Sequence, residues 1–160
     1  MKNIIHTKRL RIFPLPLEVL IKRLEIADDK NIKRALKHQI EMLTKSPEKL
    51  IWYTMWEMTE TETENPVGML HYKGEPNENN QVEIGYGTSK KHENKGYMTE
   101  AVKAFIGWTF QNTYVERVLA ETNINNIASQ KILIKSKMTK YKEDDMFFYW
   151  QINKSDWIKY

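Results

Sequence analysis

The chain has 160 residues, a net charge of +4 and no cysteine. This length fits one domain with a sizeable hydrophobic core, and we expect residues 1–160 to form a single domain. Without cysteine there is no disulfide, no catalytic thiol and no thiolate zinc site, which fits a cytoplasmic location. Lysines and glutamates are interspersed, so the small positive excess does not indicate a nucleic-acid partner. A small basic nucleic-acid-binding module is supported only by the pI of about 9.1 and by scattered aromatic residues.

No segment predicts a leader or a membrane anchor. The opening residues, MKNIIHTKRLRIF, are interrupted by basic side chains, and no stretch reaches the roughly 18 apolar residues of a membrane helix. We therefore expect no membrane partner. The sequence leaves open whether the protein is a monomer or a homodimer.

The first half of the chain predicts a strand, two helices and a hairpin. Residues 4–15 alternate apolar and basic side chains, as a strand does. Residues 52–58 and 67–72 are rich in aromatic and β-branched side chains, and the polar run TETETENP joins them as a hairpin. Between these segments, helical spacing predicts two apolar faces, formed by Leu17, Leu20, Ile21 and Leu24 and by Ile32, Leu36, Ile40 and Leu43.

The second half predicts alternating strands and helices. Strands are expected at residues 81–88, 116–122 and 146–152, and helices at 97–111 and 125–137. The helix at 97–111 is apolar on most sides and should be buried. This order predicts a mixed α/β (α+β) domain, with a mostly antiparallel central sheet and interleaved helices.

A short polar loop, SKKHENKG, joins the strand at 81–88 to the buried helix. Backbone N–H groups at a helix start lack intrahelical partners and can bind phosphate oxygens. Lys90, Lys91 and Lys95 would add positive charge there, and Gly96 would let the backbone approach an anion closely. Alternatively, Gly96 is an ordinary turn residue and the lysines are surface charges. The glycine spacing matches neither a dinucleotide fingerprint nor a P-loop.

Two segments carry a family resemblance. VEIGYGTSKKHENKGYMTEAV and, further on, ERVLAETNINNIASQKILIKSKM resemble the GCN5-related N-acetyltransferase family, closest to its ribosomal-protein alanine N-acetyltransferase branch. The resemblance covers about residues 82–138 and implies an acyl-coenzyme A N-acyltransferase fold. It also implies acetyl-coenzyme A (acetyl-CoA) as cosubstrate and no metal. The acceptor is a primary amine of a small molecule, a peptide or a protein N-terminus, and the sequence does not identify it.

The resemblance places the cofactor along three segments. Residues of the strand would bind pantetheine, the loop would hold the pyrophosphate, and two residues of the second signature would contact pantetheine or the 3′-phosphate. Asn126 alternatively caps its helix, and Lys135 alternatively is a solvated helix lysine. The implied cofactor-binding residues are Ile84, Tyr86, Gly87, Thr88, Glu93, Asn94, Lys95, Gly96, Tyr97, Met98, Thr99, Asn126 and Lys135.

Catalysis in such a family is direct acetyl transfer. An alkylammonium with a pKa near 10 must lose a proton before it attacks, and Glu83 is the candidate base. The amide of Tyr86 or Gly87 is the candidate oxyanion donor, and Ser129 the candidate proton donor to the leaving thiolate. Glu83 alternatively is a solvent-facing strand residue, and the Ser129 hydroxyl alternatively bonds its own helix backbone. Leu133 stands where many relatives have a tyrosine.

Several positions depart from the family pattern. Glu93 replaces the usual arginine or glutamine, Met98 the usual glycine or alanine, and Lys137–Met138 the usual Gly-Phe. These departures make a catalytically degenerate coenzyme A-binding or regulatory domain the alternative function. His71 and His92 lack the spacing of metal ligands, so no metal site is predicted.

Overall fold

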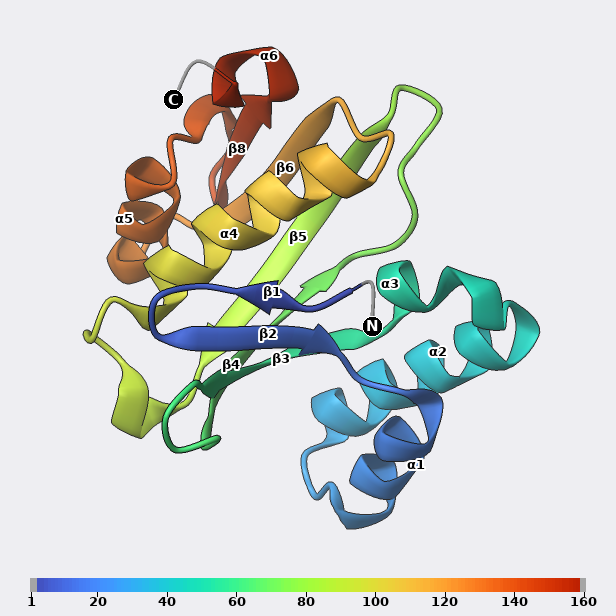
Figure 1. The fold of residues 1–160 in the computed structure, drawn as a ribbon. Coiled ribbons are helices and arrows are strands. Elements are labelled where there is room, and N and C mark those ends of the chain that lie inside the picture. The colour runs from blue at the N-terminus through green and yellow to red at the C-terminus, as the bar shows by residue number, and fades with distance from the viewer. Residues whose placement is uncertain (1–2, 159–160) are drawn as a thin grey trace.

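The computed structural model describes residues 3–158. These residues form an eight-stranded sheet in the order β1-β2-β3-β4-β5-β6-β8-β7, in which only β5 and β6 pair in parallel (Figure 1). The mixed, mostly antiparallel sheet with interleaved helices is therefore confirmed. The elements are β1 (Ile5–His6), β2 (Leu10–Pro14), α1 (Leu17–Ile26), α2 (Lys30–Lys45), the 3-10 turn η1 (Pro47–Lys49), α3 (Leu50–Tyr53), β3 (Met55–Glu60), β4 (Pro66–Tyr72), β5 (Gln81–Thr88), the 3-10 turn η2 (Lys90–His92), α4 (Tyr97–Asn112), β6 (Arg117–Asn123), α5 (Ile127–Lys135), β7 (Thr139–Glu143), β8 (Phe147–Asn153) and α6 (Lys154–Trp157).

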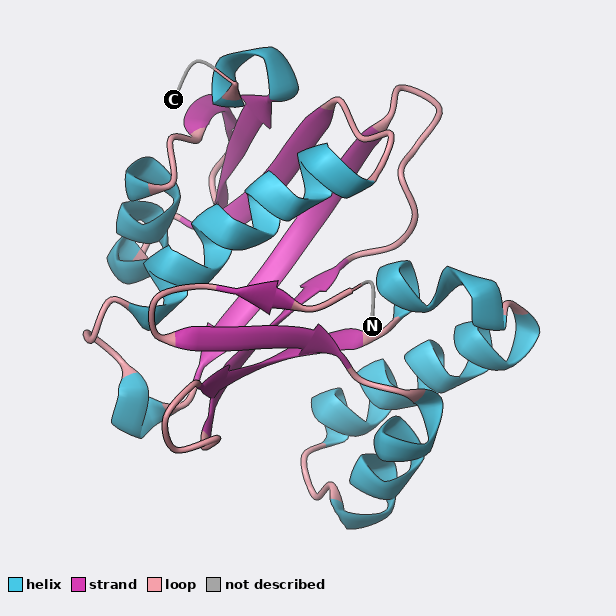
Figure 2. Cartoon of the chain, in the orientation of Figure 1, coloured by secondary structure: helices cyan, strands magenta, loops and turns pink. Residues whose placement is uncertain are grey.

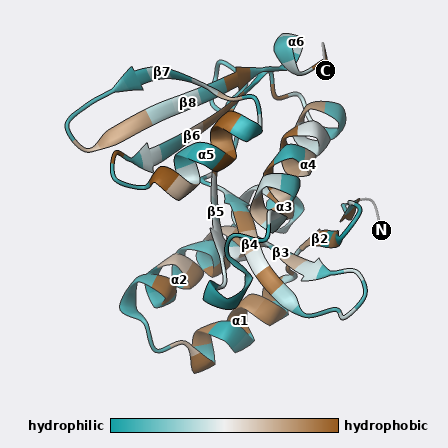
Figure 3. Cartoon of the chain, turned by 90° about the vertical axis from the view of Figure 1, so that its left-hand side faces the viewer, coloured by the Kyte–Doolittle hydropathy of each residue, from teal (hydrophilic) through white to brown (hydrophobic). Residues whose placement is uncertain are grey.

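Helices cover both faces of the sheet. Helices α4 and α5 lie on one face, whereas α1 and α2 pack against the other face beside β2 and β3 (Figure 2). The turned view shows α4 and α2 on opposite sides of β5 (Figure 3). The last residues of β5 therefore separate the helix layer of α4 from that of α1 and α2.

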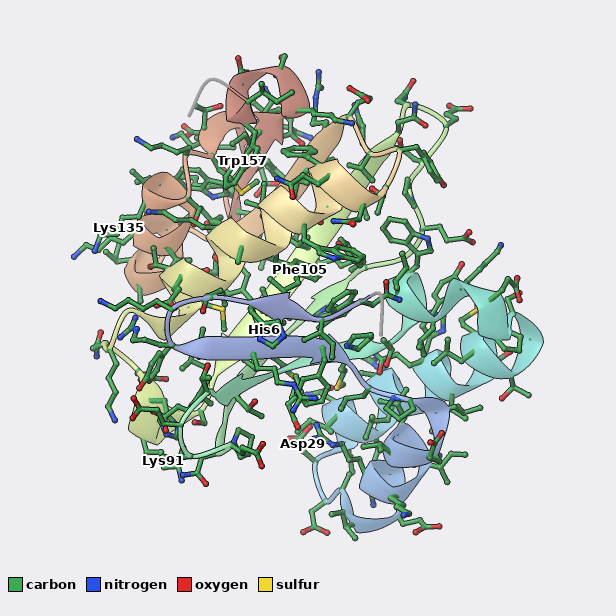
Figure 4. All side chains as sticks on the ribbon, in the orientation of Figure 1. His6, Asp29, Lys91, Phe105, Lys135 and Trp157 are labelled. Atoms are coloured by element: carbon green, nitrogen blue, oxygen red, sulfur yellow. The ribbon has the colours of Figure 1, made fainter. Side chains whose placement is uncertain are left out.

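The main core fills the space between α4 and the sheet. Phe105 on α4 is fully buried and points to the strands (Figure 4). Its ring stacks on Tyr72 at a centroid distance of 4.6 Å and meets Trp56 edge-on at 5.2 Å. A smaller cluster around Leu20, Leu36 and Leu43 joins α1 and α2 to the opposite face. Apolar burial thus fixes α4, and with it the loop that precedes α4.

Some sequence predictions for the elements were wrong. The expected strand at 52–58 begins only at Met55, because Trp52 belongs to the short helix α3 and is buried against Tyr72 at a ring distance of 4.8 Å. Tertiary burial overrides β-propensity there. The expected strand at 4–15 is split into β1 and β2 by a turn, and β7 and α6 were not predicted.

Two residues assigned to buried helix faces are exposed. Ile21 is 40% exposed because it flanks the face formed by its neighbours Leu17, Leu20 and Leu24. Ile32 is 52% exposed because it lies in the first turn of α2, at the tip of the helix pair. The apolar faces of α1 and α2 are therefore narrower than the sequence spacing predicts.

Strands β5 and β6 part after a short paired segment. Their pairing runs from Gln81–Arg117 to Glu83–Leu119. On its other side β5 pairs with β4. The Lys73 amide donates a hydrogen bond to the Glu83 carbonyl, and the Ser89 amide donates to the Val67 carbonyl, so the backbone groups of Glu83 and Ser89 face β4. Backbone groups in a strand alternate in direction, so the amides of Ile84, Tyr86 and Thr88 face the gap beside β6.

Candidate functional site

A cavity of about 420 Å³ lies between the end of β5, the start of α4 and the helix α5. Twelve of the residues predicted to serve catalysis or the cofactor line it. They are Tyr86, Gly87, Thr88, Glu93, Asn94, Gly96, Tyr97, Met98, Thr99, Asn126, Ser129 and Lys135. Two signatures separated by about 30 residues therefore converge on one space.

Gly96 is the N-cap of α4 and has a left-handed backbone, with φ 77° and ψ 2°. A residue with a Cβ pays about 1–2 kcal/mol in this region, which is why glycine is preferred. Asn94, two residues earlier, has φ 60° and is one of the residue types that tolerate this conformation. The two left-handed residues fold the loop back over the helix start.

The start of α4 presents free backbone donors to this cavity. The amide of Glu100 bonds the carbonyl of Gly96, and no side chain caps the helix. The amides of Tyr97, Met98 and Thr99 consequently have no acceptor within the helix. Because the positive end of the helix dipole lies at the same place, this end of the cavity suits an anion.

Lysines add positive charge around the cavity. Lys131 and Lys135 line it from α5, and Lys91 lies on η2, on the same side of the molecule (Figure 4). Glu93 also lines the cavity and reduces this positive charge by one. The donors that remain are the uncapped amides and the α5 lysines, a set that fits a pyrophosphate with a further phosphate.

Arg9 bonds the loop that precedes α4 and the first turn of that helix. Its Nε donates to Glu100 Oε2 at 2.7 Å and its Nη1 donates to the carbonyl of Lys95 at 3.0 Å. The guanidinium also lies 4.5 Å from the ring centre of Tyr97. The turn between β1 and β2 therefore fixes the outer side of the anion-binding loop.

Glu100 is the centre of this contact. Thr7 Oγ1 and the Arg9 amide both donate to Glu100 Oε1, at 2.6 and 2.9 Å. Burial raises the pKa of Glu100, but the hydrogen bonds from Thr7 and Arg9 outweigh burial and the pKa lies below its usual value. Glu100 thus stays ionised in the first turn of α4, where the helix dipole favours a negative charge.

Tyr86 and Ser129 meet between β5 and α5. Their hydroxyl oxygens are 2.8 Å apart, and both residues line the cavity. Burial raises the pKa of Tyr86 to about 12, although its hydrogen bond with Ser129 acts in the opposite direction. The phenol is therefore protonated at neutral pH and available as a proton donor.

Three predicted site residues do not line the cavity. Ile84 is buried in the main core, and Lys95 contributes its carbonyl to Arg9. Glu83 lies where β5 and β6 part, and its Oε1 is 2.5 Å from Lys73 Nζ. Lys73 also contacts Glu121 at 2.8 Å, so two carboxylates share one ammonium.

Asn126 has the capping role that was its alternative interpretation. Its Oδ1 accepts from the amide of Ser129 at 3.0 Å and caps α5. Asn126 also lines the cavity. The cap also fixes Ser129 opposite Tyr86.

A match to a family model decides the identity of the fold. Residues 22–139 match the model described as "Acetyltransferase (GNAT) domain". The chain belongs to the GNAT acetyltransferase family. The predicted family membership is thereby confirmed, and residues from both segments that carry the resemblance line the cavity at the start of α4.

Curated GNAT relatives match part of the chain. Over 83 residues the chain is 35% identical to the uncharacterized N-acetyltransferase YjdG of Bacillus subtilis (strain 168), covering 52% of this chain and 49% of that protein. Over 72 residues it is 32% identical to the uncharacterized N-acetyltransferase p20 of Bacillus licheniformis, covering 45% and 40%. The chain thus matches less than half the length of each of these relatives.

Solved acetyltransferase structures share the fold over 95–96% of the chain. A ribosomal-protein-S5-alanine acetyltransferase from Vibrio fischeri has a TM-score of 0.77 at 13% identity, covering 96% of this chain and 98% of that one. A GNAT-family acetyltransferase from Bacillus anthracis has a TM-score of 0.72 at 17% identity, covering 95% and 99%. A spermidine N-acetyltransferase from Vibrio cholerae, solved with CoA and spermine, has a TM-score of 0.74 at 12% identity, covering 95% and 99%.

The departures from the GNAT pattern have distinct structural consequences. Met98 is only 4% exposed and packs into the main core, and it also lines the cavity. Lys137 has φ 67°, the left-handed conformation that the usual glycine adopts without strain. Leu133 is fully buried, and the nearest phenol to Ser129 comes from Tyr86 across the gap.

Sequence reasoning missed several contributors to this GNAT site. Arg9 lies 86 residues from the carbonyl that it holds, and no local pattern reports such a contact. His92 and Lys131 line the cavity, and the Ser89 hydroxyl bonds His92 Nδ1 at 2.6 Å. The spacing of four residues between Lys131 and Lys135 was the one sequence signal that could have indicated Lys131, because it places both lysines on one face of the helix.

Neither a membrane span nor a metal centre is found in residues 3–158. None of their helices is both long and apolar enough to cross a bilayer. No group of three or more His, Cys, Asp or Glu side chains within this range is placed to hold a metal ion.

Proposed function

We propose that this protein transfers an acetyl group from acetyl-CoA directly to a primary amine. The uncapped start of α4 beside Gly96 is the single observation that carries the proposal. It offers three free amides and the helix dipole to a pyrophosphate, at the mouth of a cavity that continues toward Tyr86 and Ser129. The gap-facing amides of Ile84 and Thr88 would receive pantetheine.

The directions of the backbone amides decide between Tyr86 and Gly87 as the oxyanion donor. The Gly87 amide belongs to the ladder with β4, whereas the Tyr86 amide faces the gap. We therefore assign the oxyanion contact to the Tyr86 amide. A donor that is fixed before the reaction stabilises developing charge without reorganisation.

The reaction balances without a covalent enzyme intermediate. The amine nitrogen forms a bond to the thioester carbonyl carbon, the C–S bond breaks, and the sulfur leaves as a thiolate. The nitrogen loses a proton toward Glu83 through water, and the thiolate gains one from Ser129, which Tyr86 can resupply at 2.8 Å. Proton exchange with solvent then returns Glu83 and Tyr86 to their starting states. Glu83 suits the base role by its position where β5 and β6 part.

Thiol release tests the function. Purified protein with acetyl-CoA and a panel of amines, peptides and polyamines should release free thiol, and calorimetry should detect acetyl-CoA binding. The panel includes spermidine and peptides with an N-terminal alanine, because proteins of the same fold carry names for those substrates. Absence of both binding and thiol release would refute the proposal.

Replacement of Glu83 by glutamine tests the base. We expect the acyl-transfer rate to fall roughly 10²–10⁴-fold, with loss of the acidic limb of the pH–rate profile. A glutamine in place of Glu121, which shares Lys73 with Glu83, is the matched control. An unchanged pH–rate profile in Glu83→Gln would reject the assignment.

Glu93 favours a second candidate, a coenzyme A-binding domain without turnover. Its carboxylate lines the cavity where the family pattern has a cation or an amide. That candidate predicts acetyl-CoA binding with no thiol release from any acceptor, and measurable turnover would exclude it. Glu93→Gln should tighten binding in either case, because it removes negative charge beside the phosphates.

A further inference from the structure

A second cavity lies behind the end of β5. Its volume is about 420 Å³, and Gly87 and Thr88 line it as well as the first cavity. Its remaining wall consists largely of β4 residues and of Glu57 and Arg23 from β3 and α1. The two cavities therefore share two lining residues of one strand.

The register places Glu57 in line with Gly87. Glu57 pairs with Met69, and Met69 pairs with Gly87, so the three residues form one row across β3, β4 and β5. Paired residues direct their side chains to the same face. With strands about 4.8 Å apart, the Cα atoms of Glu57 and Gly87 are roughly 10 Å apart. A Cβ added at Gly87 would meet nothing within 4 Å, so the end of this row is open.

One ion pair supplies the charge in this cavity. Arg23 Nη2 bonds Glu57 Oε2, and the two side chains are 31% and 16% exposed. Within residues 3–158, Arg23 makes no hydrogen bond other than the one to Glu57. A guanidinium has five N–H donors and a carboxylate has two oxygens, so both groups retain unused hydrogen-bonding capacity. Solvent reaches both side chains, so a ligand that fills this capacity would replace water with a carboxylate and an ammonium.

We propose that this second cavity binds the acceptor, and that the acceptor is a small zwitterion with a primary amine and a carboxylate, such as an apolar amino acid. The inference rests on the proposed acetyl transfer. Arg23 binds the carboxylate of the acceptor and Glu57 accepts a hydrogen bond from its ammonium. The apolar remainder lies on Met69 and Pro66, with the amine directed to the Gly87 end of the row.

The same pair disfavours two other acceptor classes. A polyamine would place a second ammonium close to the Arg23 guanidinium, which is repulsive in a partly buried site. A simple alkylamine would leave the guanidinium without a partner for its remaining donors, a cost that discriminates strongly against a ligand lacking the matching group. A zwitterion matches both charges of the pair.

Paired acceptors test the inference. Each pair consists of an amino acid and the amine that lacks only its carboxylate: leucine with 3-methylbutylamine, and methionine with 3-(methylthio)propylamine. The rate of thiol release is measured for each compound, and spermidine is included as the polycation. The wild-type protein should prefer each amino acid over its decarboxylated amine. Arg23→Gln should reduce that preference by at least about tenfold. Any difference in amine basicity within an acceptor pair cancels, because the same ratio is compared between variants.

Controls separate this inference from the proposed function. Arg34→Gln removes an arginine from the exposed surface of α2 and should leave the preference unchanged. Arg23→Lys keeps the charge without the planar fork and should lose only part of the preference, with thermal unfolding checking the fold of every variant. An equal preference in wild type and Arg23→Gln, or faster turnover of spermidine than of the amino acids, would overturn the inference. Missing acetyl-CoA binding, by contrast, would count against the proposed function.

Discussion

Replacing Arg9 by alanine should weaken coenzyme A binding without slowing the chemical step. The change removes the hydrogen bonds to Glu100 and to the carbonyl of Lys95. Glu100 keeps its bonds from Thr7 and from the residue 9 amide, so no buried charge is orphaned. Because the Arg9 side chain is 41% exposed, we assign about 1–2 kcal/mol to the two bonds together.

That energy converts into affinity if it holds the loop in its binding conformation. A loss of about 1.4 kcal/mol corresponds to tenfold in Kd, so we expect acetyl-CoA to bind up to about tenfold more weakly. The KM for acetyl-CoA should rise by the same factor while kcat at saturation stays unchanged. Calorimetry gives Kd, and thiol release gives KM and kcat.

Arg11 provides the matched control for Arg9. It lies in β2, two residues after Arg9, and its guanidinium lies 4.9 Å from the ring centre of Phe13. Arg11→Ala should leave the Kd for acetyl-CoA unchanged. An unchanged Kd in Arg9→Ala, or an equal loss in Arg11→Ala, would refute the view that Arg9 positions the loop.

Three further predictions concern single backbone or side-chain features. Gly96→Val should lower acetyl-CoA affinity at least about tenfold, and Gly96→Ala less, since φ 77° disfavours any side chain and β-branched ones most; calorimetry on folded variants checks this order. Lys137→Gly should raise the free energy of unfolding by about 1 kcal/mol in urea titrations, because φ 67° costs lysine but not glycine; a lower midpoint would contradict it. The free energy of unfolding should fall as pH rises from 10 toward 12, because the Tyr86 phenol ionises near its usual pKa of 10.0 in the unfolded chain, whereas burial raises its pKa in the folded protein to about 12. Tyr86→Phe should make this fall smaller in unfolding curves recorded at alkaline pH. An unchanged slope would argue against the prediction.

The sequence predicted the parts of the site that are local in the chain. The turn from glycine to buried helix at Gly96 and the strand at 81–88 follow from residue type and period, and β5 has the predicted bounds. The contacts between Tyr86 and Ser129 and between Arg9 and Lys95 join segments 43 and 86 residues apart. Such pairs depend on strand order and crossing, which periodicity does not encode.

Errors in the predicted elements have the same origin. Trp52 reads as a strand residue by type, but burial against Tyr72 places it in a helix. Strand β7 was missed because its five residues, TKYKE, are all exposed and carry little apolar signal. β7 forms a strand because its backbone pairs with β8, not because of a pattern in its own side chains.

The two edges of the sheet bear on how the protein behaves at high concentration. An open edge is a template for strand addition by another molecule, and this is one route to aggregation. One edge here is β1, which has only two residues, and the other is β7, which presents Lys140 and Lys142. β7 also carries Glu143, which pairs with Lys140, so every second residue of this edge is charged or polar. Neither edge therefore offers a long apolar strand to a second copy of the chain.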